Sequence, residues 1–295
     1  MPLTGGFDRN DKLLIIHADD VGMCHTENKA TFLGFQNGVV SSCSLMMPCP
    51  WILEAVEFFK ENPGYDHGVH STLTSEWRLY RWGPVSSKSE VPTLLDEQGY
   101  LHKEAKDAAK ASRGEVEAEL RAQVKKAFNL GLRPSHLDTH MGPVFFRPDL
   151  LETYVKVALD NGLIPMLIKP TDSAFEVAKQ MGIMISEDLV SRILKSETPM
   201  LDNFIGMTFG SDLQERIKWF RNVLKDVKPG TLTQIIVHLG LPDEEMKAII
   251  PGQGVTSHID RYLDYQLVTS REAREIVETL GFTLVGWKDL KEGGH

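Results

Sequence analysis

Three features are scarce in this sequence: cysteine, long apolar runs and an excess of positive charge. Its 295 residues include only three cysteines, and none of them forms a Cys-x-x-Cys motif. A disulfide framework is therefore excluded, and reduced thiols in a cytoplasmic protein are expected. The first apolar run, 13–16, is far shorter than the roughly 20 residues of a membrane-spanning helix. No basic-then-apolar signal pattern precedes it, so neither membrane insertion nor secretion is expected.

Acidic residues outnumber basic ones, with 41 Asp and Glu against 32 Lys and Arg and a net charge of −9. This balance argues against the broad basic face that binds nucleic acid, and against binding to an anionic membrane surface. Two phosphate-binding fingerprints are also missing: no Gly-x-Gly-x-x-Gly follows a strand pattern, and no Gly-x-x-x-x-Gly-Lys-Ser/Thr occurs. Nucleotide chemistry is therefore not indicated.

What the sequence does contain is an alternation of short apolar runs with longer helical patterns, which predicts βα units around a parallel sheet. With 42% hydrophobic residues, the chain can bury a substantial core. About seven βα units favour a single α/β domain over residues 1–295, a distorted (β/α) TIM-like barrel, with an open doubly wound sheet as the alternative. Strands are predicted at 13–18, 39–47, 68–73, 136–140, 165–169, 233–239 and 282–287. Helices are predicted at 26–36, 51–60, 116–130, 148–161, 173–181, 212–225 and 270–280, while 183–201 fits neither pattern.

A long segment at about 74–114 interrupts this alternation. It is rich in Ser, Pro, Gly and charged residues, and a loop of this length inside a compact domain often serves function. Its aromatic residues Trp77, Tyr80 and Trp82 could stack on the ring of a ligand or anchor the segment by burial. The segment is expected as a long loop insertion in the barrel.

Histidine and aspartate recur where the predicted strands end. The first strand ends in His17-Ala18-Asp19-Asp20, the third carries His70, and a late strand ends at Val237-His238. Because such ends share one rim of a barrel, these side chains are expected to meet there. Two imidazoles and a carboxylate bind zinc or a similar transition metal and leave positions open for water. A second carboxylate, available from the Asp19-Asp20 pair, can act as a general base on that water.

The segment His136-Leu137-Asp138-Thr139-His140 offers two more histidines. In an extended strand they lie about 13 Å apart, which is too far for both to bind one ion. We therefore assign the ligand role to His140, which is nearer the rim. Asp138 shares its face and is expected to orient a histidine from outside the ligand set. His136 has either a supporting or substrate-facing role or a purely structural one.

Four segments of the chain resemble motifs of the YdjC-like carbohydrate deacetylases. The string Leu14-Ile15-Ile16-His17-Ala18-Asp19-Asp20-Val21-Gly22 is similar to the opening motif of that family, which usually ends Asn-Ala-Asp-Asp-Phe-Gly. Gly68-Val69-His70-Ser71-Thr72-Leu73-Thr74 resembles its Gly-Leu-His-x-x-Leu-Thr motif, and 136–140 resembles its His-x-Asp-Ser-His motif. The stretch 91–100 is similar to a substrate-loop segment between them. Order and spacing match over nearly the whole chain.

The resemblance implies a distorted barrel that removes acetyl groups from small N-acetylated mono- or oligosaccharides. It also implies one divalent metal ion held by Asp20, His70 and His140, with Asp19 as the catalytic base. His238 falls where related deacetylases keep a histidine that protonates the leaving amine. Zinc or a similar transition metal is expected, with magnesium as an alternative, and a homodimer is the default assembly.

The sequence departs from the family pattern in three places. His17 stands in place of the usual Asn, Met141-Gly142-Pro143-Val144 replaces further histidines after the third motif, and Leu239 replaces a common Pro. Two other functions therefore stay open. Two histidines and one carboxylate also form the facial triad of non-haem iron oxygenases, although those enzymes need no adjacent base such as Asp19. The other alternative is a non-catalytic barrel that binds a sugar and keeps the metal for structure.

Overall fold

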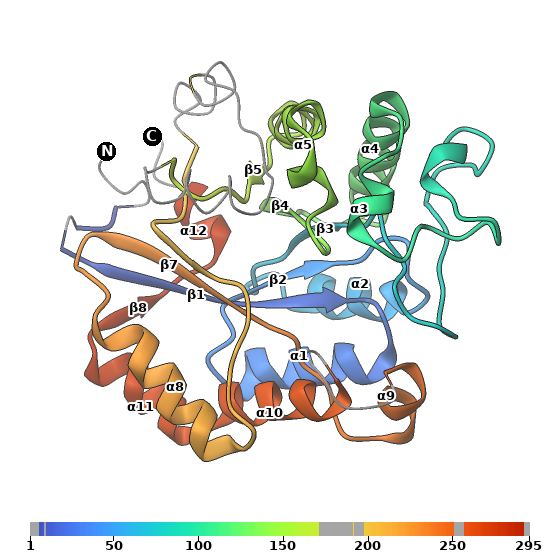
Figure 1. The fold of residues 1–295 in the computed structure, drawn as a ribbon. Helices are drawn as coiled ribbons and strands as arrows, with labels where there is room; N and C mark the ends of the chain where they lie inside the picture. Colours follow the sequence, from blue (N-terminus) through green and yellow to red (C-terminus); the bar gives the residue numbers. More distant parts are fainter. Residues whose placement is uncertain (1–5, 9, 171–190, 192–197, 251–256, 292–295) are drawn as a thin grey trace.

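The centre of the molecule is a curled sheet of parallel strands (Figure 1). The computed structural model describes residues 6–8, 10–170, 191, 198–250 and 257–291. Its strand order is β5-β4-β3-β2-β1-β7-β6, and β8 pairs with β1 beside this path. The strands are β1 (Lys12–Val21), β2 (Ser42–Leu45), β3 (Gly68–Ser71), β4 (His136–Thr139), β5 (Ile164–Pro165), β6 (Asn203–Ile205), β7 (Thr231–Val237) and β8 (Phe282–Leu284).

The two outer strands of this order meet. A parallel bridge joins Ile168, just beyond β5, to Leu201, just before β6. Leu201 N donates to Leu167 O at 2.9 Å, and Lys169 N donates to Leu201 O at 2.8 Å. The path therefore curls into a distorted barrel, which confirms the predicted (β/α) fold over the open doubly wound alternative.

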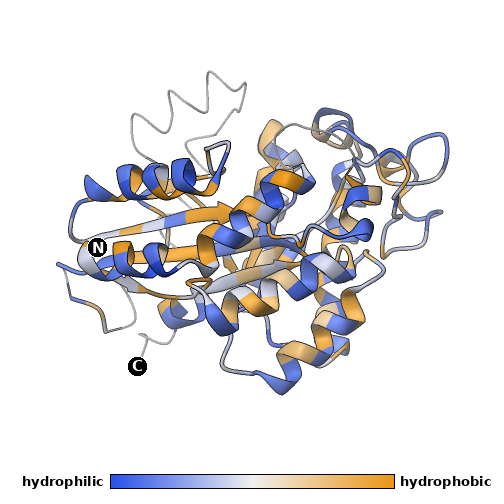
Figure 2. Cartoon of the chain, turned by 90° about the horizontal axis from the view of Figure 1, so that it is seen from below, coloured by the Kyte–Doolittle hydropathy of each residue, from blue (hydrophilic) through white to orange (hydrophobic). Residues whose placement is uncertain are grey.

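Helices cover the outside of this barrel (Figure 1). Figure 2 shows mainly hydrophobic strands and two-sided helices, which is the pattern of helices that bury one face against a sheet. The helices are α1 (His25–Asn37), α2 (Ile52–Glu61), α3 (Ala105–Ala108), α4 (Arg113–Asn129), α5 (Pro148–Asp160), α8 (Leu213–Lys225), α9 (Glu244–Ile249), α10 (His258–Thr269), α11 (Arg271–Thr279) and α12 (Trp287–Lys291), and the 3-10 turns are η1 (Pro92–Leu94) and η2 (Pro143–Phe146).

Strand β1 shows how the sequence separates the inside of the barrel from its outside. Successive side chains of a strand point to opposite faces. Leu13 and Ile15 belong to an apolar cluster with Trp287 at the base of the interior, whereas the residues between and after them join the larger cluster under the helices. His17 and Asp19 continue the inward-facing series. The interior therefore changes from apolar to polar along β1, towards the carboxyl rim.

Several elements differ from the predicted ones. β5 covers only Ile164–Pro165, ahead of the predicted strand at 165–169, and β6 follows the segment that fitted neither pattern. Helices α9 and α10 were missed, although Ser257 caps α10 in the Ser-x-x-Asp arrangement typical of a helix start. The predicted helix at 173–181 lies outside the described residues. Between β3 and α4, the 74–112 segment contains the short η1 and α3 and the isolated bridges Thr74–His102 and Leu95–Leu101.

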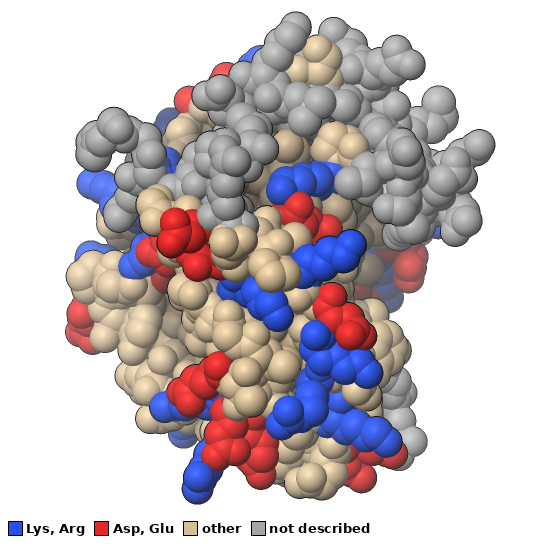
Figure 3. Space-filling view, turned by 90° about the vertical axis from the view of Figure 1, so that its left-hand side faces the viewer, with Lys and Arg blue, Asp and Glu red and all other residues tan. Residues whose placement is uncertain are grey.

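Two observations concern the surface. Among the helices of the described ranges, none is long and apolar enough to cross a membrane. On the face seen in Figure 3, the side chains of Lys and Arg are interspersed with those of Asp and Glu. Such a mixture does not produce the single-sign field that steers a polyanion to a protein.

Candidate metal centre and active site

The last residues of β1 bring two adjacent carboxylates to the carboxyl rim of the barrel. Asp19 continues the inward-facing side of the strand. Asp20 has a φ of 69°, and the pairing of β1 with β2 shifts its register between Ala18 and Val21. Asp is one of the few residues that adopt this left-handed conformation readily, and irregularities of this kind re-aim side chains next to active sites. Both carboxylates therefore face the same site.

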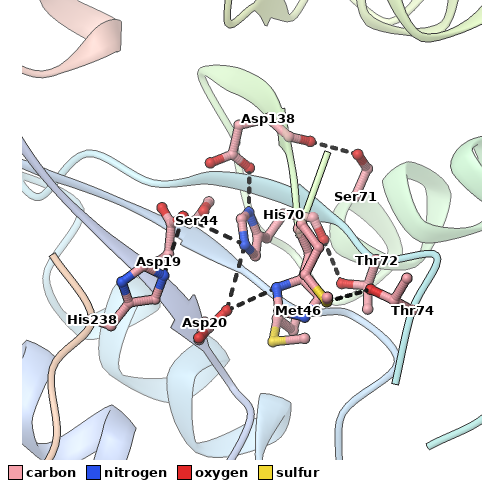
Figure 4. A network of polar contacts seen from close by, with 12 residues as sticks. Asp19, Asp20, Ser44, Met46, His70, Ser71, Thr72, Thr74, Asp138 and His238 are labelled. Atoms are coloured by element: carbon pink, nitrogen blue, oxygen red, sulfur yellow. Dashed lines mark hydrogen bonds and ion pairs between the residues drawn. The ribbon is translucent and has the colours of Figure 1, made fainter. Parts of the chain in front are cut away.

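His70 lies between these carboxylates and Asp138 (Figure 4). Strands β3 and β4 pair with His70 opposite Asp138, and Nδ1 of the ring lies 2.7 Å from Asp138 Oδ1. On the other side of the ring, Nε2 lies 3.5 Å from Asp20 Oδ1 and 3.8 Å from Asp19 Oδ2. Burial by itself lowers the pKa of His70, but the Asp138 and Asp19 carboxylates outweigh it and raise the pKa well above its ordinary value. Asp138 thus holds Nδ1 and leaves Nε2 facing the carboxylates of β1.

His140 reaches the same place from the residue after β4. Its Nδ1 lies 3.0 Å from Asp20 Oδ1, and its Nε2 lies 3.0 Å from Oε2 of Glu76 in the 74–112 segment. Burial by itself lowers the pKa of His140, but the carboxylates of Glu76 and Asp20 outweigh it and raise the pKa to about 9. In the metal-free protein, a protonated His140 therefore balances the charge of its two carboxylate neighbours.

Asp20, His70 and His140 have the donor set and the spacing of a divalent metal site. One potential ligand atom from each lies within 4.8 Å of the others. A tetrahedral ion with bonds near 2.1 Å holds its ligand atoms about 3.4 Å apart. The distances from Asp20 Oδ1 to His140 Nδ1 and His70 Nε2, 3.0 and 3.5 Å, lie on either side of that value.

Unpartnered atoms support the same fit. Asp20 Oδ1 and His70 Nε2 are buried, yet neither forms a hydrogen bond of good geometry within the described part of the chain. Buried polar atoms normally have a partner, because an unpaired one costs about 1–3 kcal/mol. Atoms that are close together, buried and not hydrogen-bonded suit a shared cation, so these residues fit a divalent metal ion.

Asp19 and His238 lie beside this group at the rim (Figure 4). Their side chains are 14% and 19% exposed, and His238 Nε2 lies 3.9 Å from Asp19 Oδ2. Burial raises the pKa of Asp19 to about 6. Burial also lowers the pKa of His238 to about 3, so its ring is neutral near pH 7. The structure therefore places a carboxylate of raised basicity beside a neutral imidazole.

His136 lies deeper in the barrel, away from the rim. It is fully buried, and its ring packs against that of His17 with a centroid distance of 5.1 Å. His17 Nε2 in turn lies 3.1 Å from Asp138 Oδ2 and 3.4 Å from Asp19 Oδ1. His17, His136 and Asp138 also meet the spacing of a metal group, but both ring nitrogens of His17 already contact serine hydroxyls. His136 therefore packs behind His17, and His17 contacts both Asp19 and Asp138 from the interior of the barrel.

Helix α10 supplies charged residues to the site, and none of the four motif segments contains them. Arg261 is 1% exposed and lies 2.6 Å from both Asp20 Oδ2 and Glu27 Oε2. One turn further along, Asp264 accepts a hydrogen bond from the backbone N of His238 at 3.0 Å. A single helix therefore supports both the Asp20 carboxylate and the residue that follows β7.

Fold and site together define a parallel α/β barrel with a histidine–carboxylate group of metal-binding type at its carboxyl rim. The model of the family described as YdjC-like protein matches residues 13–279, and the chain belongs to this family. The resemblance predicted from the motifs is thereby confirmed.

Relatives match along most of their length. A carbohydrate deacetylase of Listeria welshimeri is 37% identical over 94% of this chain and 99% of its own. A chitooligosaccharide deacetylase of Yersinia enterocolitica is 34% identical over 95% of this chain and 99% of its own. The crystal structure of an Enterococcus faecalis protein, named as a candidate cellobiose-phosphate cleavage protein, has a TM-score of 0.77 at 24% identity and covers 95% of this chain and 99% of its own. The last similarity concerns the fold alone.

Proposed function

We propose that this chain is a metal-dependent carbohydrate deacetylase that hydrolyses the acetamide group of a small N-acetylated mono- or oligosaccharide. Relatives that match nearly their whole length bear the names carbohydrate deacetylase and chitooligosaccharide deacetylase. The observation that carries the proposal is the convergence of five side chains on one rim of the barrel: Asp19, Asp20, His70, His140 and His238.

Asp20, His70 and His140 are the proposed metal ligands. Two imidazoles and one carboxylate favour zinc or a similar transition metal over magnesium, which prefers oxygen ligands. When bound, such an ion polarises the acetamide carbonyl and lowers the pKa of a bound water towards about 7. Asp20, His70 and His140 form a group of three, which is the number of protein ligands in catalytic zinc sites, whereas structural zinc sites have four. This favours the enzyme over the non-catalytic sugar-binding alternative.

Asp19 is the proposed general base. Its pKa of about 6 and its partial exposure suit a group that removes a proton from the attacking water near neutral pH. His238 Nε2, 3.9 Å away, is a neutral ring that can take up this proton and deliver it to the departing nitrogen. As the nitrogen gains the proton, the C–N bond breaks, and acetate and a free amino sugar leave.

The same carboxylate argues against the oxygenase alternative. A facial triad requires no base beside its ligands, whereas Asp19 Oδ2 lies within 3.8 Å of His70 Nε2. A single domain over residues 1–295, a homodimer and a cytoplasmic location, all expected from the sequence, remain predictions. We include them in the proposal as the setting of the enzyme.

The test is acetate release from a panel of N-acetylated mono- and disaccharides by the metal-loaded protein, with and without a chelator. We expect acetate and free amine in equal amounts from at least one sugar, and loss of both after chelation. Oxygen uptake with ferrous iron in the absence of acetate would favour the oxygenase. Sugar binding that persists under chelation, without product, would favour the non-catalytic barrel.

A further inference from the structure

Glu76 contacts the proposed metal centre without belonging to its ligand set. Its Oε2 lies 3.0 Å from His140 Nε2, the nitrogen opposite the one that faces Asp20. Its side chain is 16% exposed and that of His140 is 6% exposed, so water screens the contact only weakly. Within the described residues, no group of potential ligands joins Glu76 with Asp20 and His70. Glu76 therefore contacts His140 Nε2, the ring nitrogen that points away from Asp20.

This contact mirrors the one between Asp138 and His70. Asp138 holds Nδ1 of His70 and leaves Nε2 for the ion; Glu76 holds Nε2 of His140 and leaves Nδ1. A carboxylate that accepts a hydrogen bond from the outer nitrogen fixes both the tautomer and the orientation of a metal-binding histidine. The contact with Glu76 therefore assigns the proton of a metal-binding His140 to Nε2. The two rings would thus offer opposite nitrogens to an ion, each ring held by its own carboxylate.

The two carboxylates differ in what holds them in place. Asp138 lies in β4, whereas Glu76 lies in the 74–112 segment, which is attached by its own contacts. Trp82 donates from Nε1 to Thr74 O at 2.8 Å and from its backbone N to Ser75 Oγ at 2.9 Å. Its ring lies 6.4 Å from that of His140. Further along, Glu119 of α4 accepts hydrogen bonds from the backbone N atoms of 85 and 86 at 2.9 Å each.

We propose that Glu76 is a positioning residue that fixes His140 for metal binding through Nδ1, and that this contact links metal binding to the order of the 74–112 segment. Thermodynamic linkage makes this coupling reciprocal. If the Glu76–His140 contact increases metal affinity, metal binding stabilises the ordered segment by the same free energy. The inference rests on the metal centre of the proposed function, but not on the deacetylation reaction.

The experiment uses Co²⁺ as a spectroscopic probe on the full-length metal-free protein. Affinity is measured by chelator competition, ligand geometry by visible absorption, and order in the segment by hydrogen exchange with and without Co²⁺. The variants are Glu76→Ala, which removes the acceptor, and Glu76→Gln, whose amide oxygen can still accept from Nε2. Glu97→Gln is the matched control, since it makes the same charge change at an exposed position of the same segment.

We expect E76A to weaken Co²⁺ binding by about 10–100-fold, which is typical for losing an outer partner of a metal ligand. E76Q should lose less, and E97Q nothing. Co²⁺ should slow hydrogen exchange near Glu76 in the wild type and in E97Q, but not in E76A. Wild-type affinity and unchanged protection in E76A would overturn the inference. If the wild type itself binds neither Co²⁺ nor Zn²⁺, the proposed metal centre fails, and this inference fails with it.

Discussion

At the scale of single residues, the site shows how two adjacent carboxylates acquire different roles. Burial raises the pKa of Asp19 to about 6. Burial acts on Asp20 too, but Arg261 and His140 outweigh it and hold the pKa of that carboxyl well below its ordinary value. Groups whose pKa values are pushed apart by their surroundings divide acid–base work between them. Asp20 is therefore suited to remain an anionic ligand, while Asp19 is suited to exchange a proton.

This division predicts the effect of Asp19→Asn. The amide keeps the shape of the side chain but cannot take a proton, so turnover should fall by about 10²–10⁴-fold, the usual contribution of a general base. Metal affinity should change little, because Asp20, His70 and His140 are untouched. Steady-state acetate release and Co²⁺ titration measure the two effects separately. Asp226→Asn, the same change at an exposed position, is the control. Near-normal turnover in D19N would remove Asp19 from the base role.

Individual residues also show where prediction from sequence succeeds. Asp20, His70 and His140 could be brought together in advance, because polar side chains at the ends of parallel strands meet at one rim. Glu76 could not, since its contact depends on the path of a long segment with no periodic pattern. The orientation of Asp20 also depends on its positive φ. An Asp-Asp pair can adopt this conformation, but the sequence does not predict it.

At the scale of secondary-structure elements, α10 is the main structural support of the site. Its Arg261 lies between Asp20 and Glu27, and its Asp264 holds the backbone at His238. Burial raises the pKa of Glu27, and the Arg261 guanidinium opposes that rise. The buried Arg261 guanidinium therefore neutralises two carboxylates that would otherwise repel each other. Removing it should affect both folding and the metal site.

We predict that Arg261→Met lowers the free energy of unfolding by about 3–5 kcal/mol, the usual cost of leaving a buried charge without its partner. Arg261→Lys keeps the charge but cannot contact both carboxylates at once, so its free energy of unfolding should lie between those of the wild type and R261M. Adding Glu27→Gln to R261M should recover part of the loss, because one of the orphaned carboxylates is then neutral. Denaturant unfolding measures all four proteins. Wild-type stability in R261M would show that the network is not needed for folding.

The elements differ in how far the sequence determined them. α2, α5, α8 and α11 were predicted close to their observed positions, since strong apolar periodicity marks helices that face a core, and β1 was predicted from its continuous apolar run. β5 and β6 are only two and three residues long, so pairing with neighbours defines them more than their own sequence does. α10 was missed because its inward face carries Arg261 and Asp264 among the apolar residues, which disrupts the hydrophobic pattern.

At the scale of the whole molecule, the barrel interior is graded from an apolar base to a charged rim. Leu13 and Ile15 lie at one end of β1, His17 lies in the middle, and Asp19 and Asp20 lie at the other end. The base is mainly apolar, with Gln234 hydrogen-bonded to Trp287 Nε1, whereas the rim concentrates carboxylates and imidazoles whose spacing suits a bound cation. Metal binding should therefore act on the stability of the entire fold, with a definite pH dependence.

The sign follows from His70 and His140, the two proposed ligand histidines. Their pKa values are raised in the metal-free fold, to about 9 for His140 and well above the ordinary value for His70. Their protonated forms therefore stabilise the metal-free protein fully below about pH 6.5, the unfolded value. This contribution is lost as the pH rises through the folded pKa values. A metal ion must displace these protons, so its apparent affinity rises over the same range, by up to about tenfold per pH unit for each proton displaced.

We therefore predict that the gain in Tm on adding Zn²⁺ increases from pH 6 to pH 9. The contribution of these two histidines to the Tm of the chelated protein should fall over the same pH range. A ligand that binds only the folded state stabilises it by RT ln(1 + [L]/Kd), which is about 2.7 kcal/mol at one hundred times Kd. Calorimetry with and without EDTA at each pH gives the difference directly. His70→Ala, which removes a proposed ligand, should abolish the Zn²⁺ gain, whereas His102→Ala, outside the site, should retain it. A gain in Tm that stays constant with pH would mean that no proton leaves the site when the metal binds, and the assignment of His70 and His140 as its ligands would then be wrong.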